Sequence, residues 1–291
     1  MNNDISFLPH LTWRSTFNPW IIALPFCLIG FVYGLVFKSF TGEFTLFFNS
    51  PNSDMMIYQI ANGFLLLLVS IFGALFIMFT MKRNLKKYIF YIFSICLIVS
   101  ILSVSWVHGY IIRVTFFIDF IWVEIVLFFT GILLAGSSLI YLIKKKGGLL
   151  ERNATIFALS VLYGTIFGIT LSFWAFLVFA NFLAVFDFYS VFKGPIKKMM
   201  DESDWLPPAI IERGQTYFID IGIGDLVLYG AVITFSTKYL GFLVGIIVLF
   251  ALIIGVKASE LGVRKYGKFP GLTFPVILSS IVIITGYCFI M

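Results

Sequence analysis

Charged residues are scarce in this 291-residue chain: only 12% of its residues are Asp, Glu, Lys or Arg, whereas 60% are hydrophobic and 19% aromatic. A soluble domain of this length carries about 25% charged residues and buries its apolar side chains in a core of limited size. The excess of apolar side chains must therefore face lipid. This composition excludes a soluble globular domain and a disordered chain, and it predicts an integral, multi-pass membrane protein.

Histidine and cysteine are also scarce. The two histidines, His10 and His108, provide neither the His-Glu-x-x-His helix of a zinc protease nor the intramembrane Ser and His of a rhomboid-type protease. The three cysteines, Cys27, Cys96 and Cys288, lie inside apolar runs, which indicates buried small hydrophobes and no disulfide framework. We expect no metal and no cofactor.

Long apolar runs occupy most of the chain. At about 20 residues per crossing they predict an all-α membrane protein with nine transmembrane helices. The predicted spans are 20–37, 57–80, 88–107, 116–143, 153–171, 173–192, 219–236, 240–256 and 271–290.

The basic residues give these spans an orientation. All but three of the 20 Lys and Arg fall in the loops on the amino-terminal side; the exceptions are Lys38, Arg113 and Lys238. The positive-inside rule therefore predicts a cytoplasmic amino terminus and an outer carboxyl terminus. The net charge of +6 is then a sign of topology, and no nucleic-acid partner is expected.

The loops also suggest a division of the chain. We expect an N-terminal four-helix region, residues 1–152, and a region of helices five to nine, residues 153–291, with a cytoplasmic loop at 193–218. The loop is either a connector on the membrane surface or a mobile gate.

Four carboxylates lie inside the apolar runs: Asp119, Glu124, Asp187 and Asp225. Each costs about 2.5 to 3.5 kcal/mol on insertion scales, so each needs a partner or a function. Asp119 and Glu124 fall in the fourth span, where we expect helix–helix hydrogen bonds or a place near the outer interface. Asp220, at the start of the seventh span, is expected to be interfacial.

Asp187 and Asp225 lie at matching depths. Asp187 is about five residues, or 8 Å, from the cytoplasmic end of the sixth span, and Asp225 is about six residues, or 9 Å, from the start of the seventh. Two facing carboxylates cannot both be ionised cheaply in a low dielectric, so such a pair shares one proton. Aspartic proteases use this arrangement to activate water and to polarise a peptide carbonyl.

The residues around the two aspartates strengthen this interpretation. Gly222, Ile223 and Gly224 precede Asp225, and two glycines one residue apart allow another backbone to approach closely. Phe186 precedes the other aspartate within an aromatic-rich helix.

These residues, together with Pro270, Gly271 and Leu272 at the start of the ninth span, resemble the presenilin and signal peptide peptidase family of GxGD intramembrane aspartyl proteases, in particular its archaeal presenilin-like members. The resemblance covers helices five to nine, about half of the chain. Two positions depart from the family pattern: Phe186 stands where Tyr is usual, and Gly271 stands for the Ala of Pro-Ala-Leu. Pro275 offers a competing register for this third motif.

The resemblance implies a presenilin-like fold and hydrolysis of peptide bonds within a transmembrane helix of a substrate protein in the bilayer. Asp187 and Asp225 would be catalytic, and seven residues would bind substrate: Phe186, Gly222, Ile223, Gly224, Pro270, Gly271 and Leu272. The unwound substrate would add as a strand to the loop before Asp225 or to the segment around Pro270. We expect a cell-membrane enzyme that needs no accessory subunit.

One other class of function remains open. A proton- or cation-coupled transporter would use the same acids as a relay, together with Asp119 and Glu124. The chain shows no sign of inverted repeats, which weighs against this alternative.

Overall fold

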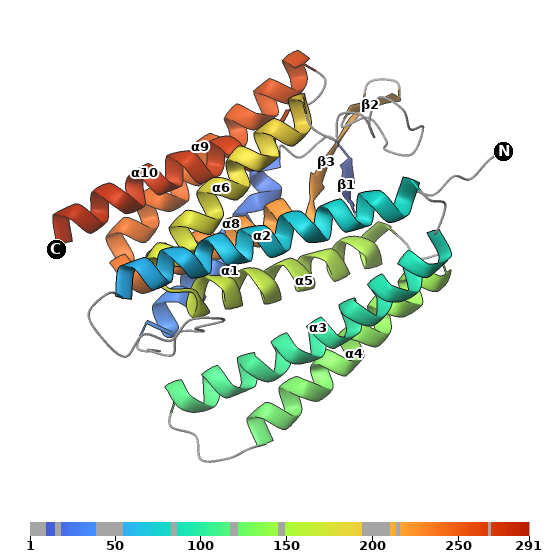
Figure 1. Ribbon diagram of the computed structural model, residues 1–291, viewed down its shortest axis with the longest axis horizontal. Helices are drawn as coiled ribbons and strands as arrows, with labels where there is room; N and C mark the ends of the chain where they lie inside the picture. Colours follow the sequence, from blue (N-terminus) through green and yellow to red (C-terminus); the bar gives the residue numbers. More distant parts are fainter. Residues whose placement is uncertain are drawn as a thin grey trace. The chain divides into compact units, whose positions relative to one another are not determined.

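A computed structural model describes residues 10–14, 19–38, 55–82, 86–116, 122–144, 149–193, 210–213, 216–266 and 269–290. These residues form nine helices, one for each predicted span, which confirms the predicted helical fold in the part of the chain that is described (Figure 1). The helices are α1 (Pro19–Val36), α2 (Met55–Lys82), α3 (Lys86–Thr115), α4 (Trp122–Lys144), α5 (Leu149–Thr170), α6 (Phe173–Phe192), α8 (Ile223–Leu240), α9 (Phe242–Tyr266) and α10 (Thr273–Ile290).

Three of these helices, α6, α9 and α10, are long and apolar enough to cross a membrane, judged by length and composition. Shorter apolar stretches lie in α1, α2, α4 and α5. Membrane insertion is therefore supported for the chain, whereas the count of nine crossings and the orientation of the termini remain predictions.

A small sheet was not predicted from the sequence. Strands β1 (His10–Arg14), β2 (Ile210–Arg213) and β3 (Thr216–Gly222) are antiparallel in the order β1-β3-β2. The prediction that the seventh span begins at residue 219 is therefore wrong, because α8 begins at Ile223, and Asp220 lies in a strand instead of a helix. The β-branched and aromatic residues from Thr216 to Ile221 favour a strand, but an apolar run alone does not distinguish a strand from a helix.

The chain divides into two compact units. One contains residues 39–155 and 170–179, and in it α3 packs along α4. The other contains residues 1–38, 156–169 and 180–291, and in it α9 packs along α10 and α1 along α8 (Figure 1). The predicted functional boundary between residues 152 and 153 is not tested by this division and remains a prediction.

Helix α8 forms the core of the second of these units. Its residues from Leu226 to Lys238 are almost all buried. Two glycine pairs with GxxxG spacing lie against it, one pair in α1 and one in α5. A Cβ added to any of these four glycines would come within 2.8 Å of a carbonyl oxygen of α8. These glycines are Gly30, Gly34, Gly164 and Gly168. Small residues at this spacing let helix backbones approach closely in a membrane, so α8 is held firmly on two sides.

Candidate active site

Asp187 lies in α6, five residues before the helix ends at Phe192. The side chain is half-buried, and its Oδ2 accepts a hydrogen bond of 3.0 Å from the backbone N–H of Leu272. One turn earlier, the carbonyl oxygen of Ala184 accepts a hydrogen bond of 3.0 Å from Thr273 Oγ1. The start of α10 is thus attached to α6 at two points, one of which is the Asp187 carboxylate.

Asp225 lies in the first turn of α8, directly after strand β3. A carboxylate is favoured there because the first turn of a helix has unpaired N–H groups and a positive dipole end. The predicted depth of six helical residues is therefore wrong in detail: the chain approaches Asp225 as a strand, and only Ile223 and Gly224 precede it in the helix.

The segment Pro270 to Leu272 lies against both aspartates. Leu272 donates its N–H to Asp187, and a Cβ at Gly271 would collide with the carboxylate of Asp225. Two consecutive residues therefore contact two carboxylates that are 38 positions apart in the sequence. This geometry favours Pro270 over Pro275 as the start of the third motif, because it is Gly271 and Leu272 that meet the acids.

An aromatic cluster fixes this segment in place. The ring of Phe269 packs edge-on against Phe192 at the end of α6, with 5.9 Å between centroids, and stacks on Phe274 at 5.6 Å and on Tyr266 at 6.2 Å. A Cβ at Gly262 would overlap the ring of Phe269, so this glycine lets the ring lie against α9. The ends of α6 and α9 therefore hold the residue next to Pro270.

Tyr229 is a residue of this site that the sequence analysis did not identify. Its hydroxyl donates a hydrogen bond of 2.8 Å to the carbonyl oxygen of Gly271, and only 2% of the residue is exposed. Its spacing of four from Asp225 places both on one face of α8, and this spacing is the signal that could have identified it.

The other predicted substrate-binding residues differ in what the structure says of them. Gly222 ends β3, opposite His10 of β1, and Ile223 begins α8. Around Gly224 no described atom outside its own helix turn lies within 4 Å of the place of a Cβ, whereas at Gly271 the Asp225 carboxylate lies close. Phe186 is half-buried beside Asp187.

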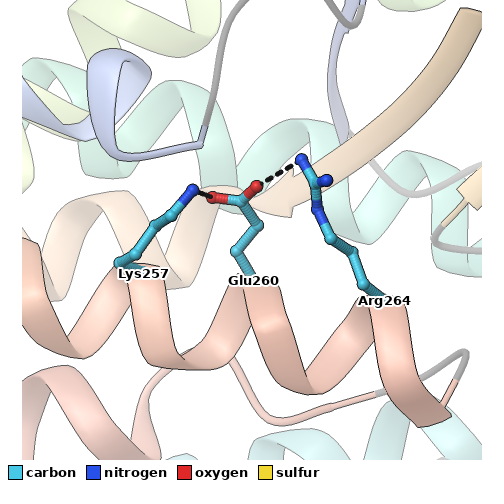
Figure 2. A network of polar contacts seen from close by, with 3 residues as sticks. All are labelled: Lys257, Glu260 and Arg264. Carbon is cyan, nitrogen blue, oxygen red and sulfur yellow. Dashed lines mark hydrogen bonds and ion pairs between the residues drawn. The ribbon is translucent and has the colours of Figure 1, made fainter.

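Two buried acids outside this site, Glu124 and Glu260, are paired with cations. Glu124 is 3% exposed, and its Oε1 lies 2.6 Å from Arg113 Nε, which joins α3 to α4. Glu260 is 2% exposed and contacts Lys257 at 2.9 Å and Arg264 at 2.6 Å on α9 (Figure 2). Asp119 lies outside the described residues. Glu124 is thus held between two helices by an ion pair, whereas helix–helix hydrogen bonds or a place near the outer interface had been expected.

Cysteines and metal-binding groups add no further site. Cys27 is buried, whereas Cys288 is exposed on α10 and does not fit the expected burial; both are free, and the side chain of Cys96 lies outside the description. No cluster of three or more His, Cys, Asp or Glu suited to a metal ion occurs among the described residues.

Solved structures provide a comparison for this arrangement. The chain is similar to two crystal structures of a presenilin-family intramembrane aspartate protease. The C222 crystal form aligns with a TM-score of 0.58 and 16% identity over 93% of this chain and 99% of that chain. The P2 form aligns with a TM-score of 0.57 and 16% identity over 93% and 96%. No protein-family model and no curated protein matches the chain. The presenilin-like fold expected from the sequence is confirmed.

Proposed function

We propose that this chain is an intramembrane aspartic endopeptidase of the GxGD type, in which Asp187 and Asp225 are the catalytic pair. The observation that carries the proposal is that one peptide segment, Gly271–Leu272, contacts both carboxylates. Such a contact gathers two acids from α6 and α8 around one point. A pair of acids near one another is the requirement of aspartic protease chemistry.

The reaction follows from sharing one proton between the two acids. The ionised carboxylate accepts a proton from water while the protonated one donates a hydrogen bond to the substrate carbonyl. The water oxygen bonds to the carbonyl carbon, and the tetrahedral intermediate collapses with a proton passing to the leaving nitrogen as the C–N bond breaks. The products are a new carboxyl terminus and a new amino terminus.

The substrate in this proposal is a transmembrane helix of another protein, taken from the bilayer of the cell membrane. A helix uses its own backbone N–H and C=O groups, so the bond to be cut must first be unwound. By resemblance to presenilins, the substrates would have their amino termini outside. The single chain would act without accessory subunits, cofactor or metal, and nucleic acid has no part in it.

Strand β3 is the better docking place for the unwound stretch. Around Pro270, the Gly271 carbonyl, the Leu272 N–H and the Leu272 carbonyl are already bonded within the chain. In β3, by contrast, β2 pairs only with residues 216–219, so from Asp220 to Gly222 the edge away from β1 has no described partner strand. This edge leads directly to Asp225, so a strand added there would bring its backbone to the acids.

The test of the function is cleavage of a transmembrane peptide by the purified chain in lipid vesicles. Asp187→Asn and Asp225→Asn should each lower kcat by about 10²- to 10⁴-fold, the usual contribution of an acid or base group. Glu124→Gln is the matched control, because it removes another buried carboxylate and should leave cleavage intact. Ion flux without cleavage by the wild type would instead establish the transporter.

The docking place has its own test, a series of substrate peptides with one backbone N-methyl group moved along the unwound stretch. Successive N–H groups of a strand point to opposite edges, so only every second one faces β3. Each methyl on a facing position should slow cleavage about tenfold, the effect of one lost hydrogen bond. Equal rates along the whole series would show that the substrate does not pair as a strand.

A further inference from the structure

The peptide group between Gly271 and Leu272 is bonded at both of its polar atoms. Its carbonyl accepts the Tyr229 hydroxyl at 2.8 Å, and its N–H donates to Asp187 Oδ2 at 3.0 Å. The described chain has no cis peptide bond, and in a trans peptide the C=O and N–H point in opposite directions. This one peptide therefore bridges from α8 to α6, the two helices that carry the aspartates.

Gly271 is the residue of this bridge whose backbone rotation the local chain restricts least. Pro270 before it has its φ fixed by the ring, and Leu272 after it is fixed because its carbonyl accepts the Val276 N–H at 3.0 Å in the first turn of α10. Glycine has no Cβ to restrict its backbone, so the local chain alone does not set the rotation of the Gly271–Leu272 peptide. Phe186, beside Asp187, has no hydroxyl that could form a hydrogen bond with the Gly271–Leu272 peptide.

Tyr229 supplies the missing constraint from a rigid position. The residue is 2% exposed on α8, a helix against which α1 and α5 pack closely through glycines. A buried tyrosine hydroxyl needs a hydrogen-bond partner, and here that partner is the Gly271 carbonyl. Hydrogen bonds in a chain also polarise one another, so a donor on the carbonyl strengthens the N–H at the other end of the same peptide.

We infer that Tyr229 is a positioning residue of the aspartate pair: its hydroxyl sets the rotation of the Gly271–Leu272 peptide, which aims the Leu272 N–H at Asp187 and keeps Gly271 against Asp225. The inference rests on the proposed protease function for its effect on catalysis. The contact itself stands on the two hydrogen bonds and on the close approach of Gly271 to Asp225.

The chain offers a matched control on the same helix. Thr234 is fully buried, and its hydroxyl donates to the carbonyl of Gly30 in α1 at 3.0 Å and to Gly230 in its own helix at 2.8 Å. Its hydroxyl joins α8 to α1, whereas the hydroxyl of Tyr229 joins α8 to the Pro270–Leu272 segment beside the aspartates. Thr234→Val and Tyr229→Phe each remove one such hydroxyl with little change of shape.

The first measurement is the rate of cleavage of a transmembrane peptide by the full chain in vesicles. Tyr229→Phe should lower kcat about tenfold, which corresponds to about 1.4 kcal/mol, with KM within about twofold of the wild type. Thr234→Val should keep kcat while lowering the unfolding temperature at least as much as Tyr229→Phe does. A wild-type kcat in Tyr229→Phe overturns the inference and leaves the protease function standing.

The second measurement does not depend on activity. Labelling glycine with carbonyl ¹³C and leucine with ¹⁵N selects the Gly–Leu peptides, which are residues 34–35, 148–149 and 271–272. Leu272→Ile assigns the third signal by removing it. Tyr229→Phe should move the Leu272 amide proton upfield, because its bond to Asp187 loosens, whereas Thr234→Val should leave it in place. An unmoved signal in Tyr229→Phe overturns the inference, even if the wild type cleaves nothing.

Discussion

Four acids in the described part of the chain are held in two different ways. Glu124 and Glu260 are held by cations, Arg113 in one case and Lys257 with Arg264 in the other. Asp187 instead accepts a backbone N–H, and a backbone glycine lies against Asp225. Removing one charge of an ion pair leaves the other unpaired in a low dielectric, so the contacts of Glu124 and Glu260 are costly to break. The backbone N–H of Leu272 carries no charge, so its contact with Asp187 has no ion pair to lose.

The cation-held acids differ from each other in their number of partners. Among the described residues Glu124 has one cation within ion-pair distance, whereas Glu260 has two, one on each side of it along α9 (Figure 2). The side chain of Glu124 is 4% exposed and that of Glu260 is 0% exposed. Loss of one partner should therefore isolate Glu124 but not Glu260.

The largest effect is expected when the Arg113–Glu124 ion pair is broken. Arg113→Met should lower the free energy of unfolding by about 3 kcal/mol, the lower end for a broken buried pair, because Arg113 itself is 34% exposed. Arg264→Met should lower it by less than about 1 kcal/mol, since Arg264 is 57% exposed and Lys257 still faces the carboxylate. Chemical unfolding of the two variants in detergent measures the difference.

A second substitution separates the cost of the unpaired Glu124 carboxylate from the cost of losing the Arg113 side chain. Adding Glu124→Gln to Arg113→Met removes the isolated carboxylate and should recover part of the lost stability. Similar losses in Arg113→Met and Arg264→Met would contradict the distinction between one and two cations.

Arg113 and Glu124 also indicate how much of the structure was predictable. Apolar runs and their lengths predicted each of the nine helices in the described part of the chain, because long apolar runs favour helices in a membrane protein. The ion pair did not follow from the predicted spans, which end at 107 and begin again at 116. In the structure α3 continues to Thr115 and α4 begins at Trp122, so Arg113 and Glu124 lie near facing helix ends.

The strand before Asp225 was beyond sequence reasoning for a different reason. β3 pairs with β1, and the partners His10 and Gly222 are 212 positions apart. The backbone pairing that turns an apolar run into a strand therefore depends on a segment at the other end of the chain. The aspartates could be singled out from the sequence, because an acid in an apolar run is expensive wherever it lies, and their catalytic role remains a prediction.

The surroundings of Gly271 were predictable only in part. The Pro-Gly-Leu sequence indicated a place of close approach, but only the folded chain identifies the Asp225 carboxylate and the Tyr229 hydroxyl as what approaches it. A short motif specifies the local backbone, whereas its neighbours come from helices 40 or more positions away.

A smaller effect is expected on kcat when the backbone beside Asp225 is changed. Gly271→Ala restores the alanine of the motif that the segment resembles, and Gly271 does not have the positive φ that disfavours alanine. Its methyl group would nevertheless meet the Asp225 carboxylate, which should rotate away and lower kcat about tenfold, or about 1.4 kcal/mol, at nearly unchanged stability. Gly136→Ala is the control, since no described atom lies within 4 Å of its Cβ; kcat should stay the same. A wild-type kcat in Gly271→Ala would mean that Asp225 needs no fixed neighbour, and the contrast with the cation-held acids would then rest on Asp187 alone.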